Sequence, residues 1–375
     1  MGRAIEVPIT PSVLAWAIKE SGIEPAEVAR SIDVDEAQLA RWVRGEERPN
    51  LTAFKKLAQV LRRPSATFLL PRPPKTHEPH VAFRHPPGVA DRDLLPEERL
   101  RIREVHRVQR VVGGLLDDLG ESRPALPSIS MDDDPERVGG RIRDLVGATT
   151  EEQTAWLDMS AALRAWRRRF EELGVLVFLL PMGADGARGF SLWDDAAPAI
   201  VINTHWNTAA RIYTLFHELA HLLTRTNSIC VETTRPKRDG SDLERWCERV
   251  AAAALMPADA VRALVDGAKS IGIATAKRVA AHFRVSLRAA ALRLINLQLA
   301  GWPLFRSIPA SADGKAAAGG GAGRDRPRKR FDEYGRRATF TFVRAVKQDV
   351  ISASEAMRYL DVGDRDLDEL EKLAA

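Results

Sequence analysis

The segment His217-Glu218-Leu219-Ala220-His221 holds the residues whose types and spacing could do chemistry in this chain. Positions four residues apart lie on one face of a helix, so the two imidazoles could bind a single metal ion. Glu218 would lie on an adjacent part of the helix surface, where its carboxylate could take a proton from a water molecule at the metal. Two His ligands with a Glu general base between them are the arrangement of a zinc peptidase.

The surrounding residues favour a metal site over an amphipathic helix with two solvated His. A solvated helix face would usually carry Lys, Glu and Gln around the pair. The neighbours here are apolar: Leu215, Phe216, Leu219, Ala220, Leu222 and Leu223. Two His and a Glu in so apolar a helix need partners, because burying polar groups unpaired is costly. A metal ion would supply these partners.

A zinc site of this type needs a third protein ligand and keeps one position open for water. The downstream candidates are Glu244 and Glu248, which lie one turn apart on one face of a predicted helix. A structural role would also explain Glu244, because Ser241 followed by Glu three residues later forms a capping box. Considered by themselves, these residues leave both carboxylates open as ligands.

A short β section should position the metal-binding helix, which we expect at about residues 208–223. Apolar runs at 175–180, 189–193 and 198–203 predict three strands. Strands leading into such a helix are the usual architecture of small zinc peptidases, where a sheet edge can hold a substrate strand by main-chain hydrogen bonds.

A peptidase also needs a donor that stabilises the tetrahedral oxyanion. The candidates are His205, Tyr213 and Arg211. Each also has a structural explanation, because a lone loop His is usually exposed and Tyr213 could pack in the core. Asn203 could fix the loop between strand and helix or touch substrate.

The first seventy or so residues have the pattern of a small helical bundle. We predict helices at 11–20, 25–31, 35–44 and 51–61, with Thr10 capping the first of them. The run from Pro25 to Gly45, which closes with Arg41-Trp42-Val43-Arg44-Gly45, resembles the helix-turn-helix of phage repressors of the Cro or XRE class.

In that class the third helix enters the DNA major groove through its N-terminal residues. Here that start carries Asp35 and Glu36, whose charge opposes the phosphates. Gln38, Arg41 and Arg44 are the residues that could contact DNA, and Gln38 could read adenine. The alternative is a helical module that contacts another protein or the peptidase domain.

Composition places the chain among ordinary globular proteins. It has 375 residues, 45% hydrophobic and 29% charged, enough for two or three domains. No apolar run is long enough to span a membrane, and the N-terminus lacks the pattern of a signal peptide. Two Cys make no disulfide framework, and a net charge of +5 permits nucleic-acid contact without demanding it. We therefore expect a cytoplasmic protein.

Composition changes along the chain predict five segments. They are a helix-turn-helix domain at 1–72, a Pro-rich linker with connecting helices at 73–160, the zinc metallopeptidase domain at 161–305, a flexible Ala/Gly and basic linker at 306–330, and a small C-terminal segment at 331–375. The role of the last segment is open.

Several elements are expected outside the catalytic segment. Residues 96–119, 134–145, 151–173 and 273–297 have helical patterns. Residues 338–343 could form a strand. In addition, the acidic stretch 361–371 could dock on the basic run 324–330.

Two blocks of the chain resemble the ImmA/IrrE metallopeptidase family. They are 189–223, which ends in the HELAHLL sequence, and 244–257, ERWCERVAAAALMP. The family's second block reads E-x-x-A/C-N-x-F/V-A-A-x-x-L-x-P, and its first Glu is the third ligand. The resemblance therefore implies Glu244 as that ligand and Zn²⁺ as the cofactor. Glu248 stands where the family usually has Asn, and its added charge could act on the site or pair with a neighbouring Arg.

The resemblances together imply an α+β, mostly helical fold. A helix-turn-helix bundle would be followed by a zincin-like peptidase domain with a small sheet. The implied function is an intracellular zinc metallo-endopeptidase that cleaves a transcriptional repressor or another regulatory protein in a stress or phage-related response, with double-stranded DNA as a further partner. The alternatives are a non-proteolytic DNA-binding regulator with a sensory or structural metal site, or one component of a toxin–antitoxin pair. Glu218 favours catalysis, because a structural site needs no general base.

Overall fold

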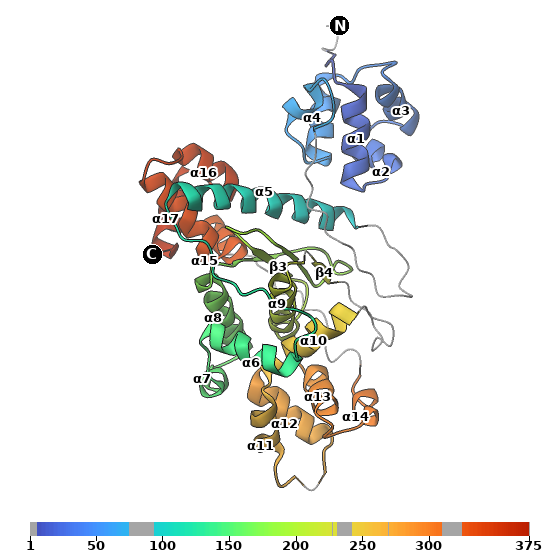
Figure 1. Cartoon of the computed structure of the whole chain (residues 1–375). Coiled ribbons are helices and arrows are strands. Elements are labelled where there is room, and N and C mark those ends of the chain that lie inside the picture. The colour runs from blue at the N-terminus through green and yellow to red at the C-terminus, as the bar shows by residue number, and fades with distance from the viewer. Residues whose placement is uncertain are drawn as a thin grey trace. The chain divides into compact units, whose positions relative to one another are not determined.

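The computed structural model describes residues 6–74, 94–226, 228–230, 242–268, 270–309 and 325–374 (Figure 1). The chain forms two compact units. The first comprises Met1–Glu78 and Asp91–Glu104, and the second comprises Pro79–Ala90 and Val105–Ala375. None of the described helices combines the length and the apolar character that crossing a membrane requires.

The first unit is the predicted helical bundle. Its elements are α1 (Pro11–Ser21), α2 (Pro25–Ser31), α3 (Glu36–Arg44), α4 (Leu51–Val60) and the 3₁₀ helix η1 (Ser65–Leu69). Local signals set these limits: Pro11 occupies the first turn of α1, and Gly45 ends α3 in the left-handed conformation with φ 77°. Thr10 holds the N-cap position of α1 without a side-chain capping bond. The four predicted helices are confirmed.

The second unit contains a four-stranded mixed sheet of order β1-β3-β2-β4. β1 (Leu176–Leu180) pairs parallel with β3 (Ala199–Asn203), and β2 (Gly189–Leu192) pairs antiparallel with both β3 and β4 (Ser228–Cys230). The three predicted strands are confirmed. β4 was not predicted, because three residues are too few to show an alternating pattern.

Helices precede and follow the sheet in the sequence. Those before it are α5 (Pro96–Asp118), α6 (Pro135–Val146), α7 (Thr150–Ala155) and α8 (Met159–Glu172). Those after β3 are α9 (Thr208–Leu223), α10 (Asp242–Leu255), α11 (Ala258–Val265), α12 (Ile273–Phe283), α13 (Leu287–Asn296), α14 (Trp302–Arg306), α15 (Arg326–Lys347), α16 (Ala353–Leu360) and α17 (Asp364–Ala374). The mostly helical α+β prediction is confirmed.

Two of the predicted continuous helices are interrupted. The 151–173 segment breaks between α7 and α8, where the Asp158 carboxylate accepts a hydrogen bond from the N–H of Ala161 and starts a new helix. The 273–297 segment breaks at Arg284, which is left-handed, and Ser286 caps the next helix. In both places a capping side chain competes successfully with helix continuation.

The sheet is covered on both faces, which explains why its strands are continuous apolar runs. Val177, Ile200 and Ile202 belong to the core that includes α8, α9 and α10. Phe178, the next residue along β1, points to the other face and meets Tyr334 of α15 edge-on, with ring centroids 5.6 Å apart.

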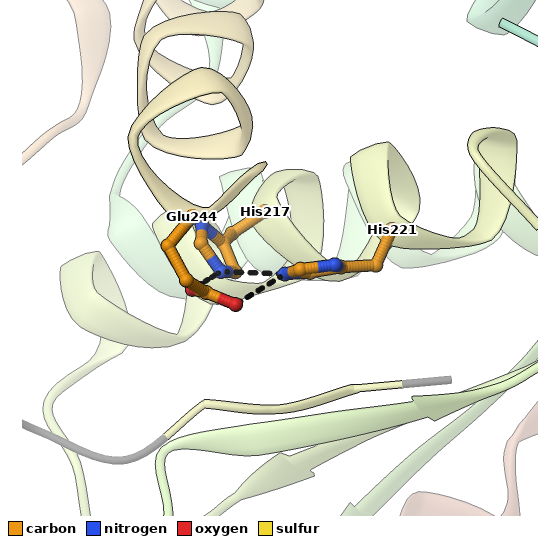
Figure 2. A group of neighbouring side chains, drawn as sticks. All are labelled: His217, His221 and Glu244. Atoms are coloured by element: carbon orange, nitrogen blue, oxygen red, sulfur yellow. Dashed lines mark hydrogen bonds and ion pairs between the residues drawn. The ribbon is translucent and has the colours of Figure 1, made fainter. Parts of the chain in front are cut away.

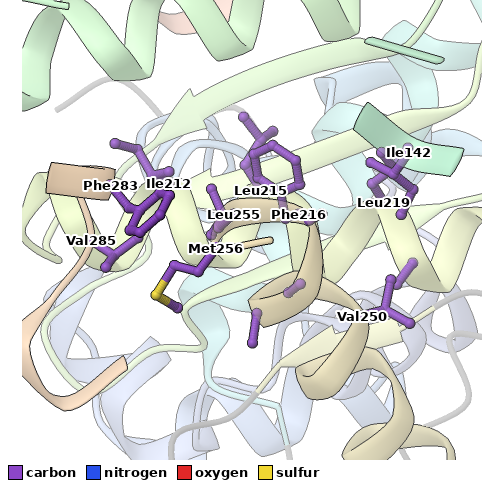
Figure 3. Packing of buried hydrophobic residues seen from close by; sticks show 14 of the residues in the cluster. Ile142, Ile212, Leu215, Phe216, Leu219, Val250, Leu255, Met256, Phe283 and Val285 are labelled. Atoms are coloured by element: carbon purple, nitrogen blue, oxygen red, sulfur yellow. The ribbon is translucent and has the colours of Figure 1, made fainter. Parts of the chain in front are cut away.

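The core around α9 is the largest cluster of buried side chains in the described part of the second unit (Figure 3). Phe216 packs edge-on against Trp166 and Phe170 of α8, with centroid separations of 4.8 and 5.1 Å. Leu219 lies in the same cluster as Val250 of α10. This packing fixes the rotation of α9 about its own axis, and therefore the direction in which its polar residues point.

The predicted strand at 338–343 is wrong, because these residues belong to α15. The alternation of Thr and Phe suggests a strand, but Ala338 and Phe342 are fully buried whereas Phe340 is 43% exposed. Burial at positions four apart, with the residue midway between them exposed, is a helical pattern. Residues 326–330, predicted as part of a flexible linker, form the first turns of the same helix.

α15 packs closely against β1 at a kink in the helix. Gly335 has φ 83°, and a Cβ there would meet Glu171 Oε1 and, at 2.9 Å, the carbonyl oxygen of Val177. Arg167 bridges the two elements, donating from Nε to the Val177 carbonyl at 3.1 Å and from Nη1 to the Asp332 carbonyl at 2.6 Å. α15 is therefore packed against the sheet.

The predicted docking of the acidic stretch on the basic run is confirmed at one residue. Asp361 accepts a hydrogen bond from Arg326 Nη2 at 2.8 Å and also pairs with Arg330. Both Arg side chains belong to the first turns of α15, whereas Asp361 follows α16. These ion pairs hold the end of α16 against the start of α15.

Candidate metal centre

α9 positions the HELAH residues. The helix begins after Asn207, whose side chain accepts a hydrogen bond from the N–H of Ala210 at 2.9 Å. The loop before it is held by the buried Asn203, whose Oδ1 accepts a hydrogen bond from the N–H of His205 at 3.1 Å. The Asn203 amide also donates to the carbonyls of Gly183 and Ala187, in the loop between β1 and β2, at 2.9 and 3.0 Å. The Asn203 side chain therefore fixes both loops, which is its structural role.

α10 brings Glu244 to α9. The Tyr213 hydroxyl of α9 donates to the Glu248 carbonyl of α10 at 2.8 Å, so the two helices are joined one turn beyond Glu244. Trp246 Nε1 donates to the Asp133 carbonyl at 2.8 Å, which fixes the same turn of α10 from the other side of the helix. Ser241, the expected cap of α10, lies outside the described residues.

Three polar side chains converge at this contact (Figure 2). His217 Nε2 lies 3.2 Å from His221 Nε2 and 3.3 Å from Glu244 Oε2, and His221 Nε2 lies 3.3 Å from Glu244 Oε1. His217 is 3% exposed, His221 1% and Glu244 6%. They form a group of His and carboxylate side chains with the spacing of metal ligands.

The geometry of this group fits a divalent metal ion. Ligand atoms around a tetrahedral zinc, at bond lengths of about 2.0–2.1 Å, lie about 3.3–3.4 Å from one another. The two Nε2 atoms are 3.2 Å apart, and each lies 3.3 Å from a different oxygen of the Glu244 carboxylate, separations close to that spacing. Two imidazole nitrogens and one carboxylate are also the donor set of catalytic zinc sites, which leave a fourth position for water.

Electrostatics at the site favour an ionised carboxylate. Burial raises the pKa of the Glu244 carboxyl, but hydrogen bonds with His217 and His221 outweigh burial and hold that pKa well below its ordinary value. Glu244 is therefore ionised near neutral pH, as a metal ligand must be. Glu218, the residue after His217, is 0% exposed.

His221 has a second polar neighbour that the sequence did not reveal. Its Nδ1 atom lies 3.4 Å from the hydroxyl oxygen of Thr226, which follows the end of α9. The signal that could have found Thr226 is its distance from the helix end, because residues just past a helix terminus fold back onto its last turn.

The other predicted site residues lie apart from the cluster or serve as supports. Arg211 donates from Nε to the Trp206 carbonyl at 2.6 Å and also to the Thr204 carbonyl, so its guanidinium holds the loop before α9. Tyr213 joins α9 to α10, as described above. The side chains of His205 and Glu248 are exposed.

In the first unit, the cationic residues predicted to contact DNA are already paired. Arg41 Nε lies 2.8 Å from Glu47 Oε1, and Arg44 Nε lies 2.6 Å from Glu46 Oε1. Asp35 caps α3, accepting a hydrogen bond from the N–H of Gln38 at 2.6 Å. Exposed ion pairs are weak, at about 0–1 kcal/mol, so phosphates can replace the acidic partners.

Comparisons with known families agree with both units. Residues 170–295 match the IrrE N-terminal-like domain, a peptidase family, and residues 14–68 match the helix-turn-helix family. These matches confirm the resemblances to ImmA/IrrE peptidases and to XRE-type helix-turn-helix domains. A comparison with curated proteins gives no match.

Proposed function

We propose that this chain, which combines an IrrE N-terminal-like metallopeptidase domain with an N-terminal helix-turn-helix of the XRE type, is a zinc-dependent endopeptidase that cleaves a regulatory protein. The observation that carries the proposal is the buried group of His217, His221 and Glu244 at metal-ligand spacing. Glu218, beside the first ligand, adds the general base that a structural site would not need.

The proposed roles follow from the residue types. His217, His221 and Glu244 hold the ion, which when bound supplies Lewis-acid polarisation of the scissile carbonyl and lowers the pKa of a water molecule. Glu218 accepts a proton from the attacking water and delivers it to the leaving amine. The carboxylate of Glu218 is shielded from bulk water at 0% exposure, which keeps the transferred proton within the site.

The described sheet suggests where an extended substrate would bind. The outer edge of β1 is occupied, because Arg167 donates to the Val177 carbonyl and Gly335 of α15 lies against the same carbonyl. β4 forms the opposite edge of the described sheet. A substrate segment would add to that edge by main-chain hydrogen bonds.

The helix-turn-helix domain supports a regulatory substrate. In this proposal it brings the peptidase to a repressor-type regulator or to the repressor's operator, in a stress or phage-related response in the cytoplasm. Arg41 and Arg44 would then exchange their acidic partners for DNA phosphates.

A cleavage experiment tests the catalytic proposal. Purified chain is loaded with zinc and incubated with candidate repressors, in parallel with Glu218→Gln and with Glu248→Gln, which changes an exposed carboxylate on α10. We expect cleavage by the wild type and by Glu248→Gln. Glu218→Gln should bind zinc normally but lose about 10²–10⁴-fold in rate, the usual contribution of a general base. Equal rates for Glu218→Gln and the wild type would overturn the assigned role.

The second candidate function is a non-proteolytic regulator with a sensory or structural metal. The nearly complete burial of the three ligand side chains favours it, because a catalytic metal must stay accessible to water and substrate, whereas a structural or sensory ion needs no such access. Stoichiometric zinc together with no cleavage of any regulator tested, and a metal-dependent change in DNA binding, would support this function instead.

A further inference from the structure

The end of α9 is built around its second proposed metal ligand. Arg225 N–H donates to the Leu222 carbonyl at 3.0 Å, and Thr226 N–H donates to the His221 carbonyl at 3.1 Å. These two bonds define a Schellman motif, in which Thr226 is the second residue past the C-cap and His221 is its partner in the last turn. The motif therefore places the Thr226 side chain against His221.

A non-glycine residue holds the left-handed position of this motif. Arg225 has φ 57°, a left-handed conformation that is unfavourable for residues with a Cβ. Its guanidinium stacks 3.5 Å above the Trp193 ring centroid, and its Nη2 donates to the Leu126 carbonyl at 2.7 Å. These contacts offset the backbone cost and keep the turn in place.

Hydroxyl groups connect the turn to the imidazole. Thr226 Oγ1 lies 3.4 Å from His221 Nδ1 and 2.9 Å from Thr224 Oγ1. Thr224 Oγ1 in turn donates to the His221 carbonyl at 2.9 Å. The two hydroxyl groups therefore link the Nδ1 atom of His221 to the carbonyl oxygen of the same residue.

The His221 carbonyl constrains the directions of these bonds. A carbonyl oxygen only accepts, and both hydroxyls reach it, Thr224 Oγ1 at 2.9 Å and Thr226 Oγ1 at 3.2 Å. A Thr226 hydroxyl that gives its single proton to this carbonyl, or to Thr224 Oγ1, can only accept from His221, whose Nδ1 then carries the proton. With its proton on Nδ1, a neutral imidazole offers the lone pair of Nε2, the atom that faces His217 and Glu244, to a metal ion. Binding of the ion would then replace the hydrogen bond between Nε2 and the Glu244 carboxylate.

We infer that Thr226 is a positioning residue for the metal site, resting on the proposed function: it holds His221 in the Nδ1–H tautomer and directs Nε2 to the metal. Outer partners of ligating His usually contribute 10–100-fold to metal affinity or activity. Thr226 would take the place that a carboxylate or a backbone carbonyl often has in such sites.

The test compares zinc affinity, measured by competition with a chromophoric chelator, in the wild type, Thr226→Val and Thr226→Ser. Thr226→Val keeps the shape but removes the hydroxyl, and we expect about 10–100-fold weaker zinc binding. Thr226→Ser retains the hydroxyl and should restore affinity close to that of the wild type. Thr214→Val is the matched control, because it removes a buried hydroxyl of α9 that donates to the Ala210 carbonyl instead.

Thermal unfolding of the metal-free proteins separates positioning from stability. We expect Thr226→Val and Thr214→Val to unfold at similar temperatures while only Thr226→Val loses zinc affinity. Wild-type affinity in Thr226→Val, or an equal loss in Thr226→Ser or Thr214→Val, would overturn the role of Thr226 and leave the proposed function intact. Failure of the wild-type chain to bind zinc would overturn the proposed function itself, and this inference with it.

Discussion

α9 and α3 both bear predicted functional residues, and they hold their polar groups in opposite ways. On α9 the two His are buried beside Glu244, at separations close to those around a shared ion. On α3 the two Arg are partly or fully exposed and pair with nearby Glu residues. Buried polar groups need a partner, whereas exposed ones can pair with water, with each other or with a ligand.

The comparison shows which functional inferences geometry can support. A buried constellation narrows the alternatives, because its polar groups must be satisfied inside the protein, and here two imidazoles and a carboxylate turn toward one another. An exposed pair such as Arg44 and Glu46 excludes little, because its formation changes stability by at most about 1 kcal/mol. The metal proposal is therefore tightly constrained by the structure, and the DNA proposal depends on the helix-turn-helix domain.

The largest expected effect is on α9. His217→Ala removes one of the three proposed ligands, and we predict that stoichiometric zinc binding is lost in isothermal titration calorimetry. His205→Ala is the control, since it removes an exposed His from the loop before the same helix and should bind zinc like the wild type. Equal zinc binding by both variants would contradict the claim that the buried His217 binds the ion and the exposed His205 does not.

The second largest expected effect is that zinc stabilises the second unit and leaves the stability of the first unit unchanged. Zinc at about 100 times its dissociation constant should stabilise the fold that binds it by about 2.7 kcal/mol. We predict that hydrogen exchange slows in α9 and α10 on addition of zinc and does not change in α1 to α4. His217→Ala should abolish the difference. Protection that rises equally in both units would show that zinc acts elsewhere.

The smallest effect concerns α3. Glu46→Gln with Glu47→Gln releases Arg44 and Arg41 from their acidic partners, and we predict a few-fold tighter binding to double-stranded DNA at low salt. Glu24→Gln with Glu27→Gln removes the same charge at α2 and should change affinity less. Fluorescence anisotropy over a salt series measures both. An equal gain in the two double variants would mean that net charge alone, not release of these Arg, sets DNA affinity.

Much of the fold could be predicted because its signals are local. Pro11, Asn50 and Gly45 mark helix limits within one or two residues, and the apolar strands before α9 are short but continuous. The strand proposed at 338–343 failed because its Thr-Phe alternation has the period of a sheet. Only the packing of Ala338 and Phe342 against neighbours distant in sequence shows the helical period.

Some residues of the candidate site could likewise be predicted from local sequence spacing, whereas others depend on tertiary packing. The i, i+4 spacing of His217 and His221 is a local property of one helix, so the sequence alone can pair them. Glu244 meets them only because α10 packs on α9, and residue spacing did not distinguish it from Glu248 without the family resemblance. Thr226 was missed because its contact depends on the left-handed turn at Arg225, which sequence patterns rarely reveal at a non-glycine residue.

The most direct test of the central claim is a crystal of the zinc-loaded chain measured on both sides of the zinc absorption edge. We predict one anomalous peak per chain at about 2.0–2.1 Å from His217 Nε2, His221 Nε2 and a Glu244 carboxylate oxygen. A zinc-loaded crystal with no peak among these three side chains, or with its zinc bound at other residues, would contradict the account.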